Sequence, residues 1–226
     1  LVISQHGGGG YPELAIFKGG GNYKDMIRGA AKEGYVVWAP ITLMYPYPDR
    51  DTGTPIPAEV RRDIDARFRK LGTSLMGVEV MRISRSLDVM LRRPEVDPAR
   101  VAMIGLSYGG YHTLYTMAVD PRIKTGVASC SFRDRAAMDA EMPAGKAPEG
   151  RPFDMTGPDL VRLIAPRALQ VQNGVNDKGL PIDMVRRAAA EAQSHYAPNG
   201  LFEFKEFDGG HEWRGDIAWA FLRKTL

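Results

Sequence analysis

The sequence predicts an α/β protein with a mostly parallel central sheet and helices on both faces. Short β-rich runs alternate with longer helical patterns along the chain, which is typical of right-handed β-α-β crossovers. Several of the runs are almost continuously apolar, as expected of parallel strands that are covered on both sides. The 226 residues are 44% hydrophobic and 25% charged, which is typical of a globular chain rather than a disordered or fibrous one.

Six runs are predicted to be strands, and each combines apolar or β-branched residues with a nearby turn signal. The first ends in a glycine cluster, and the second is stopped by Pro40. In chain order the six predicted strands are residues 1–4, 35–39, 101–104, 125–128, 168–171 and 201–204.

Helical patterns fill the gaps between the strands. The clearest runs over 74–93, where apolar residues recur at alternating steps of four and three and so share one helix face. A second helix is predicted over 181–195, with proline at its start, and a third over 215–224. A shorter helix pattern covers 111–117.

Two segments, 41–57 and 133–157, are rich in proline, glycine and charge and show no clear period. Long loops of this kind often form lids or pocket walls, although a solvated insertion is an equal alternative. No repeat or linker divides the chain, so we expect residues 1–226 to form a single domain.

Composition excludes several classes of protein. The net charge is +3, and the basic residues are scattered, so nucleic-acid binding is disfavoured. A single cysteine excludes an intrachain disulfide and a cysteine-rich zinc site. No apolar run reaches the roughly 18 residues of a membrane span. The chain starts at Leu1, inside an apolar run, so we read it as a fragment and leave its localisation, cytoplasmic or secreted, open.

The chemistry centres on Gly105-Leu106-Ser107-Tyr108-Gly109, a G-x-S-x-G motif between a predicted strand and a predicted helix. A sharp strand-to-helix turn would hold the serine in a strained conformation and expose its side chain. The flanking glycines remove Cβ atoms that would clash there. The sequence therefore predicts that Ser107 is a nucleophile.

A serine nucleophile needs a base, and four histidines are available. His211 follows the last predicted strand, and the carboxyl ends of parallel strands gather on the side where Ser107 emerges. We therefore predict His211 as the base. His112 is expected to be a packed core residue, His195 to be exposed, and His6 precedes a glycine run.

The base needs a carboxylate that orients it. Asp177 follows the strand at 168–171 and precedes His211 by 34 residues, which leaves room for one helix and one strand. The resulting order Ser, Asp, His fits the motif. Asp134 is the rival acid, and Asp183 is expected to lie in the first turn of a helix.

An oxyanion hole would complete the site. One donor is predicted to be the backbone amide of Tyr108. The other is expected from His6-Gly7-Gly8-Gly9-Gly10, with Gly8 first and Gly9 second, because glycines let a backbone approach the substrate closely.

These motifs resemble the α/β-hydrolase superfamily over nearly the whole chain. Within it, the chain is similar to the dienelactone-hydrolase, acetyl-esterase and prolyl-oligopeptidase-like groups. The residues that carry the resemblance are His6 to Gly9, the approach Val96 to Val101, Gly105 to Tyr111, Gly174 to Asp177, and Gly209 to His211. The resemblance implies hydrolysis through an acyl-enzyme, without metal or cofactor.

The chain departs from these groups in three ways. One or two strands that usually precede the His-Gly loop are absent, which would leave a sheet edge uncovered and is compatible with oligomers. Dienelactone hydrolases use a cysteine nucleophile, whereas the serine here favours an esterase. In the oligopeptidases a propeller domain precedes the motif, whereas none precedes it here.

We therefore expect a serine carboxylic-ester hydrolase acting on a small-molecule ester. An oligopeptidase-like amide hydrolase and a catalytically silent binding domain are the alternatives. The acyl and alcohol groups of the substrate stay open.

Overall fold

The computed structural model describes residues 1–8, 11–17, 21–43, 58–140, 155–198 and 200–226. Their strands form one six-stranded sheet in the order β2-β1-β3-β4-β5-β6, and every neighbouring pair is parallel. The strands are β1 (Val2–Gln5), β2 (Val37–Trp38), β3 (Ala102–Leu106), β4 (Thr125–Ser129), β5 (Ala168–Gly174) and β6 (Phe202–Phe207). All six predicted strands are therefore present.

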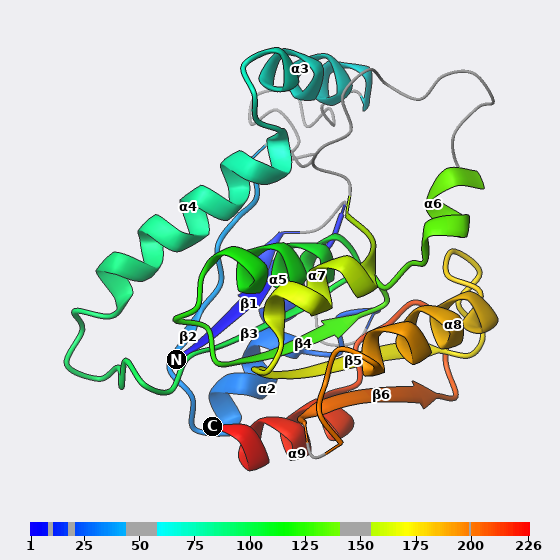
Figure 1. Ribbon diagram of the computed structural model, residues 1–226. Coiled ribbons are helices and arrows are strands. Elements are labelled where there is room, and N and C mark those ends of the chain that lie inside the picture. The colour runs from blue at the N-terminus through cyan, green and yellow to red at the C-terminus, as the bar shows by residue number, and fades with distance from the viewer. Residues whose placement is uncertain (9–10, 18–20, 44–57, 141–154, 199) are drawn as a thin grey trace.

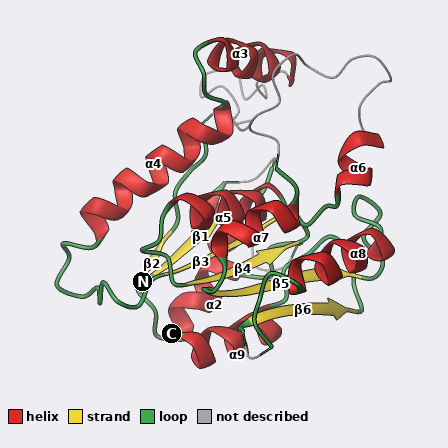
Figure 2. Cartoon of the chain, viewed as in Figure 1, coloured by secondary structure: helices red, strands yellow, loops and turns green. Residues whose placement is uncertain are grey.

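Helices cover both faces of the sheet (Figures 1 and 2). One face carries α4 (Leu75–Met90), α5 (Tyr108–Val119), α7 (Gly157–Ile164) and α8 (Ile182–Gln193), and the other carries α2 (Met26–Lys32) and α9 (Gly215–Thr225). Three further helices are α1 (Pro12–Ile16), α3 (Ala58–Lys70) and α6 (Arg135–Ala140). The predicted α/β class with a parallel sheet between two helical layers is confirmed.

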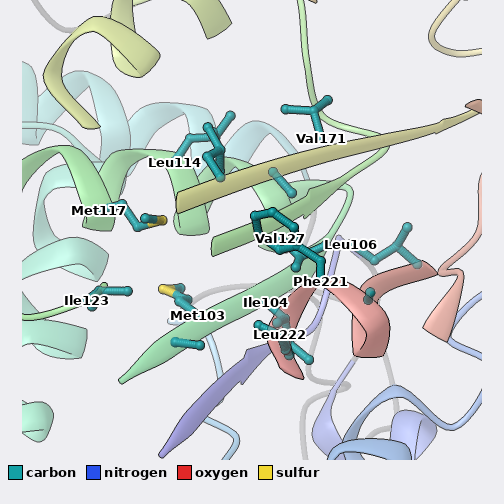
Figure 3. Packing of buried hydrophobic residues seen from close by; sticks show 14 of the residues in the cluster. Met103, Ile104, Leu106, Leu114, Met117, Ile123, Val127, Val171, Phe221 and Leu222 are labelled. Atoms are coloured by element: carbon teal, nitrogen blue, oxygen red, sulfur yellow. The ribbon is translucent and has the colours of Figure 1, made fainter. Parts of the chain in front are cut away.

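The core lies between the sheet and these helices (Figure 3). Every residue of β3 and β4 is buried, as expected of central strands covered on both sides. Leu114 and Met117 bring α5 onto one face, and Phe221 and Leu222 bring α9 onto the other. A Cβ atom at Gly126 would lie 2.1 Å from Met117 Sδ, so this glycine is what lets α5 approach β4.

The predicted segment 133–157 is not irregular throughout. Its described part contains α6, and α7 begins at its last residue, Gly157. The expectation was wrong at α6, because a helix of six residues is too short to show a period in sequence. At the other end of the segment, the last residue, Gly157, is the first residue of α7. Most of the other predicted loop, 44–57, lies outside the described residues, as do 141–154.

The carboxyl ends of all six strands lie at one edge of the sheet, because the strands are parallel (Figure 1). Ser107 follows β3, Asp177 follows β5, and His211 follows β6. The topology thus delivers the three predicted side chains to the same edge. Among the described residues, no helix combines the length and the apolar character needed to cross a membrane.

Candidate active site

Ser107 occupies a sharp turn between β3 and α5. Its φ of 59° and ψ of −120° are strained for a residue with a side chain. The turn closes only because its neighbours are glycines. A Cβ atom on Gly105 would lie 2.2 Å from the Gly109 carbonyl oxygen, and a Cβ atom on Gly109 would lie 2.1 Å from the Gln5 carbonyl oxygen. The predicted strand-turn-helix context of the motif is therefore confirmed.

The turn places Ser107 at the amino end of α5. Tyr108 is the first residue of the helix, so its amide lies in the first turn, where backbone N–H groups point out of the helix end. The helix dipole adds partial positive charge at this end. An anion forming beside the Ser107 hydroxyl would be stabilised there.

The loop after β1 packs directly on this turn. A Cβ atom at Gly7 would lie 2.7 Å from the Leu106 carbonyl oxygen and 3.1 Å from Ser107 Cβ, so only glycine allows the approach. The Gly7 amide donates to the Tyr23 hydroxyl at 3.0 Å, and this hydrogen bond helps to hold the loop in place. Gly8 follows and is exposed. Gly9, the second predicted oxyanion donor, lies outside the described residues.

Asp177 and His211 lie in direct contact. His211 Nδ1 lies 2.7 Å from Asp177 Oδ2, and the other carboxylate oxygen accepts from the Gly179 amide at 2.9 Å. The Asp177 side chain is 1% exposed, whereas that of His211 is 37% exposed. A buried carboxylate therefore holds one ring nitrogen, which leaves the other nitrogen of a half-buried ring for chemistry.

The rival carboxylates are engaged elsewhere. Asp134 is paired with Arg187 at 2.9 Å and accepts from the Ala137 amide. Asp183 lies in the first turn of α8, as expected, and is exposed beside Arg186.

The remaining histidines have structural partners or lie elsewhere. His112 is fully buried, as predicted, and its Nδ1 contacts the Tyr108 carbonyl oxygen at 2.8 Å. Burial lowers the pKa of His112 to about 4, so its ring is neutral. His6 is also buried, and its Nε2 accepts from the Thr42 amide, so its Nδ1 carries the proton toward the Gly7 carbonyl. His195 is half-buried rather than exposed.

Ser129 ties the turn to the histidine loop. Its backbone oxygen accepts from the Ser107 amide at 2.8 Å, and its hydroxyl donates to the Glu212 carbonyl at 3.2 Å. This fully buried residue at the end of β4 therefore holds both sides of the site. Sequence reasoning did not find Ser129, because its role comes from the strand order and not from a motif.

Cys130 follows Ser129 and lies beside the Asp177–His211 pair. It is the single cysteine of the chain, and it is buried. Burial raises the pKa of its thiol to about 11, so at neutral pH it is a protonated thiol and a poor nucleophile. In the sequence, this single cysteine served only to exclude an intrachain disulfide and a cysteine-rich zinc site.

Glu79 is a buried carboxylate away from this site, and it pairs with the partly exposed Arg82. Its carboxylate meets Arg82 at 2.8 Å and also accepts from the Leu43 amide. Burial raises the pKa of Glu79. The pair lines a pocket of about 290 Å³ between α4 and the segment after β2.

The strand order, the crossovers and the turn after β3 are those of the α/β-hydrolase fold. Crystal structures with this fold align over almost the whole chain. Thermus thermophilus TT1662 matches with a TM-score of 0.71 and 17% identity, covering 99% of this chain and 87% of that one. Acetyl Xylan Esterase 1 from Thermoanaerobacterium sp. JW/SL YS485 matches with a TM-score of 0.65 and 19% identity, covering 100% and 74%.

One curated protein gives a sequence match. The protein named "Putative hydrolase YtaP" of Bacillus subtilis (strain 168) is 30% identical over 138 residues. The match covers 57% of this chain and 45% of that protein, so it spans less than half of the relative's length. No protein-family model matches the chain.

Proposed function

We propose that this chain is a serine carboxylic-ester hydrolase that works through an acyl-enzyme, with Ser107, His211 and Asp177 as its catalytic triad. The observation that carries the proposal is the 2.7 Å contact between His211 Nδ1 and Asp177 Oδ2 at the sheet edge where the strained Ser107 turn also lies. The esterase and hydrolase names of the similar proteins support the same class.

In the proposed acylation step, His211 Nε2 takes the Ser107 proton while Ser107 Oγ attacks the ester carbonyl carbon. Asp177 accepts from Nδ1–H, fixes the tautomer and stabilises the imidazolium. The amides of Tyr108 and Gly8 are the proposed donors to the oxyanion, and Gly9 stays a second candidate.

The imidazolium then protonates the leaving alcohol, and the carbonyl reforms as the acyl-enzyme. In deacylation, His211 takes a proton from water, the hydroxide attacks the acyl carbon, and the proton returns to Ser107. The carboxylic acid leaves, and the free enzyme is restored. These steps use side chains, amides and water, and need no metal or cofactor.

The catalytic unit is proposed to be the single domain 1–226, because every described strand belongs to one sheet. A small-molecule ester is the proposed substrate.

A fluorophosphonate probe and two substrate series separate this function from its alternatives. We expect the probe to label the chain once, short p-nitrophenyl esters to be turned over, and peptide anilides to resist cleavage. Cleavage of the anilides at a comparable kcat/KM would favour the oligopeptidase-like amide hydrolase instead. Absence of both labelling and turnover would favour the silent binding domain and contradict the proposed function.

Ser129 should act as a positioning residue within this site. Ser129→Ala removes the hydrogen bond to the Glu212 carbonyl, which costs about 1 kcal/mol of folding free energy and loosens the loop that carries His211. We expect kcat to fall about tenfold with KM unchanged, since the base and not the substrate is displaced. Steady-state kinetics and thermal unfolding measure the two effects.

Ser131→Ala is the matched control. Ser131 is equally buried two residues further on, and its hydroxyl has no hydrogen-bond partner among the described residues. This variant should keep both kcat and KM. Equal losses of kcat in the two variants would argue against a positioning role for Ser129.

A further inference from the structure

The proposed mechanism does not use the thiol of Cys130, which lies beside the proposed acid and base. Cys130 follows β4 with a φ of 50°, a left-handed conformation that is uncommon for a residue with a side chain. Its Sγ, a carboxylate oxygen of Asp177 and a ring nitrogen of His211 all lie within 4.8 Å of one another. Three loops, after β4, β5 and β6, therefore converge on one small volume.

A thiol, an imidazole and a carboxylate are the three side-chain groups that bind Zn²⁺ in proteins. Metal–ligand distances of about 2.0–2.3 Å place the ligand atoms of a tetrahedral ion about 3.3–3.7 Å apart. The three atoms here are already within 4.8 Å, so shifts of about 1 Å would bring them to a shared ion. The 2.7 Å contact between Asp177 and His211 would open slightly.

The surroundings of the thiol also favour a cation. Cys130 Sγ lies 3.6 Å from the Glu212 carbonyl oxygen and 4.0 Å from that of Gly210. Both carbonyl dipoles place partial negative charge toward this volume. Of the three side chains, that of His211 is 37% exposed, so the cluster is open to solvent at this residue.

We propose that Cys130, Asp177 and His211 form an inhibitory site for a thiophilic divalent cation of the Zn²⁺ and Cd²⁺ class. Three protein ligands leave the fourth coordination position to water. When the ion binds, a metal–sulfur bond replaces the S–H bond, and the thiol proton passes to solvent. No electron is transferred, so a chelator should reverse the binding.

The ion would inhibit the enzyme because it binds two groups that the proposed reaction needs. Asp177 and His211 are the orienting acid and the base of the proposed function, on which the inhibitory part of this inference rests. Nδ1, the ring nitrogen that faces Asp177, can bind the ion only after its proton has moved to Nε2. A ring protonated on Nε2 cannot take the Ser107 proton, and the Asp177 carboxylate then binds the ion instead of accepting a hydrogen bond from the ring. This differs from a metal cofactor, because the ion blocks the reaction.

Cadmium titration of the purified full chain tests the site without using activity. Cys130 is the single cysteine, so any cadmium–thiolate charge-transfer absorption reports this residue alone. We expect one equivalent of Cd²⁺ to produce the band, Cys130→Ala to lose it, and His211→Ala to weaken the Cd²⁺ affinity at least tenfold. Even partners outside the first coordination sphere typically contribute 10–100-fold to metal affinity.

His195→Ala is the control, because it removes a histidine that lies outside the cluster. It should leave the Cd²⁺ affinity of the thiolate band unchanged. The site is contradicted if no thiolate band appears at saturating Cd²⁺, or if His211→Ala binds Cd²⁺ as tightly as the unchanged chain. These outcomes need only a folded chain, which circular dichroism verifies, and His211 is exposed enough for its alanine variant to fold.

Inhibition is measured separately as loss of ester turnover with Zn²⁺ or Cd²⁺ and its recovery with a chelator. We expect Cys130→Ala to require at least tenfold more metal for half inhibition. Equal sensitivity of the two proteins would overturn the inhibitory role. If the unchanged chain shows the band but no ester turnover at all, the proposed function fails while the metal site stands.

Discussion

Replacing Ser107 by alanine should abolish ester turnover and leave the fold intact. The hydroxyl is the proposed nucleophile, and without it only binding and oxyanion stabilisation remain. We expect kcat to fall by about 10⁴-fold or more. Turnover of a short p-nitrophenyl ester measures the loss.

The fold should tolerate this change for a local reason. Ser107 is the N-cap residue of α5, yet its side chain makes no capping hydrogen bond, so the helix loses nothing with the hydroxyl. Alanine also meets the same backbone strain as serine at a φ of 59°. We expect the midpoint of thermal unfolding to shift by less than about 2 °C.

Ser194→Ala provides the control for this experiment. Ser194 is an exposed serine whose hydroxyl donates to the Glu191 carbonyl. Its variant should keep turnover and fluorophosphonate labelling, while Ser107→Ala loses both. Labelling of Ser107→Ala at the original rate would show that another residue is the nucleophile.

How well each strand could be predicted from the sequence depends on whether both of its faces are buried. Strands β3 and β4 are buried on both faces, so their apolar runs stand out in sequence and were predicted nearly to their ends. The edge strand β2 was predicted over 35–39 but covers only Val37–Trp38. Among the strands that the structure describes, β1 is its single neighbour, and the two pair at two register positions.

Of the described helices, α1, α2, α3, α6 and α7 were not predicted, although α3 and α7 carry patterns that the sequence shows. In α3, Val60, Ile64 and Phe68 recur every four residues among many charges, which is a helical period. In α7, Thr156 and Asp159 form a capping box, with the Thr156 hydroxyl accepting from the Asp159 amide at 3.1 Å. A threonine three residues before an acidic residue is visible in sequence.

The residues of the candidate site also differ in whether the sequence alone could predict them. Ser107, Asp177 and His211 could be predicted because each follows a strand, and parallel strands end at one edge. Ser129 and Cys130 could not, because their importance depends on β4 lying between β3 and β5. Sequence order alone does not state which strands are neighbours, and so the residues that join the nucleophile turn to the histidine loop became visible only in the fold.

Asp177→Asn should be the second most damaging change, lowering kcat by about 10³–10⁴-fold with little loss of stability. Asparagine has the shape of aspartate, and its oxygen can still accept from the Gly179 amide. Its NH₂ group would then face His211 Nδ1 as a donor, so the ring would accept there and carry its proton on Nε2. A base that is already protonated on Nε2 cannot take the Ser107 proton.

Asp134→Asn tests the rival acid under the same conditions. Asp134 binds Arg187 and the Ala137 amide at the start of α6, and none of its described hydrogen bonds reaches a histidine. We therefore expect its asparagine variant to keep kcat within about twofold, with any effect confined to stability. If kcat fell far more in Asp134→Asn than in Asp177→Asn, the assignment of Asp177 would be wrong. The 2.7 Å contact with His211 would then be structural rather than catalytic.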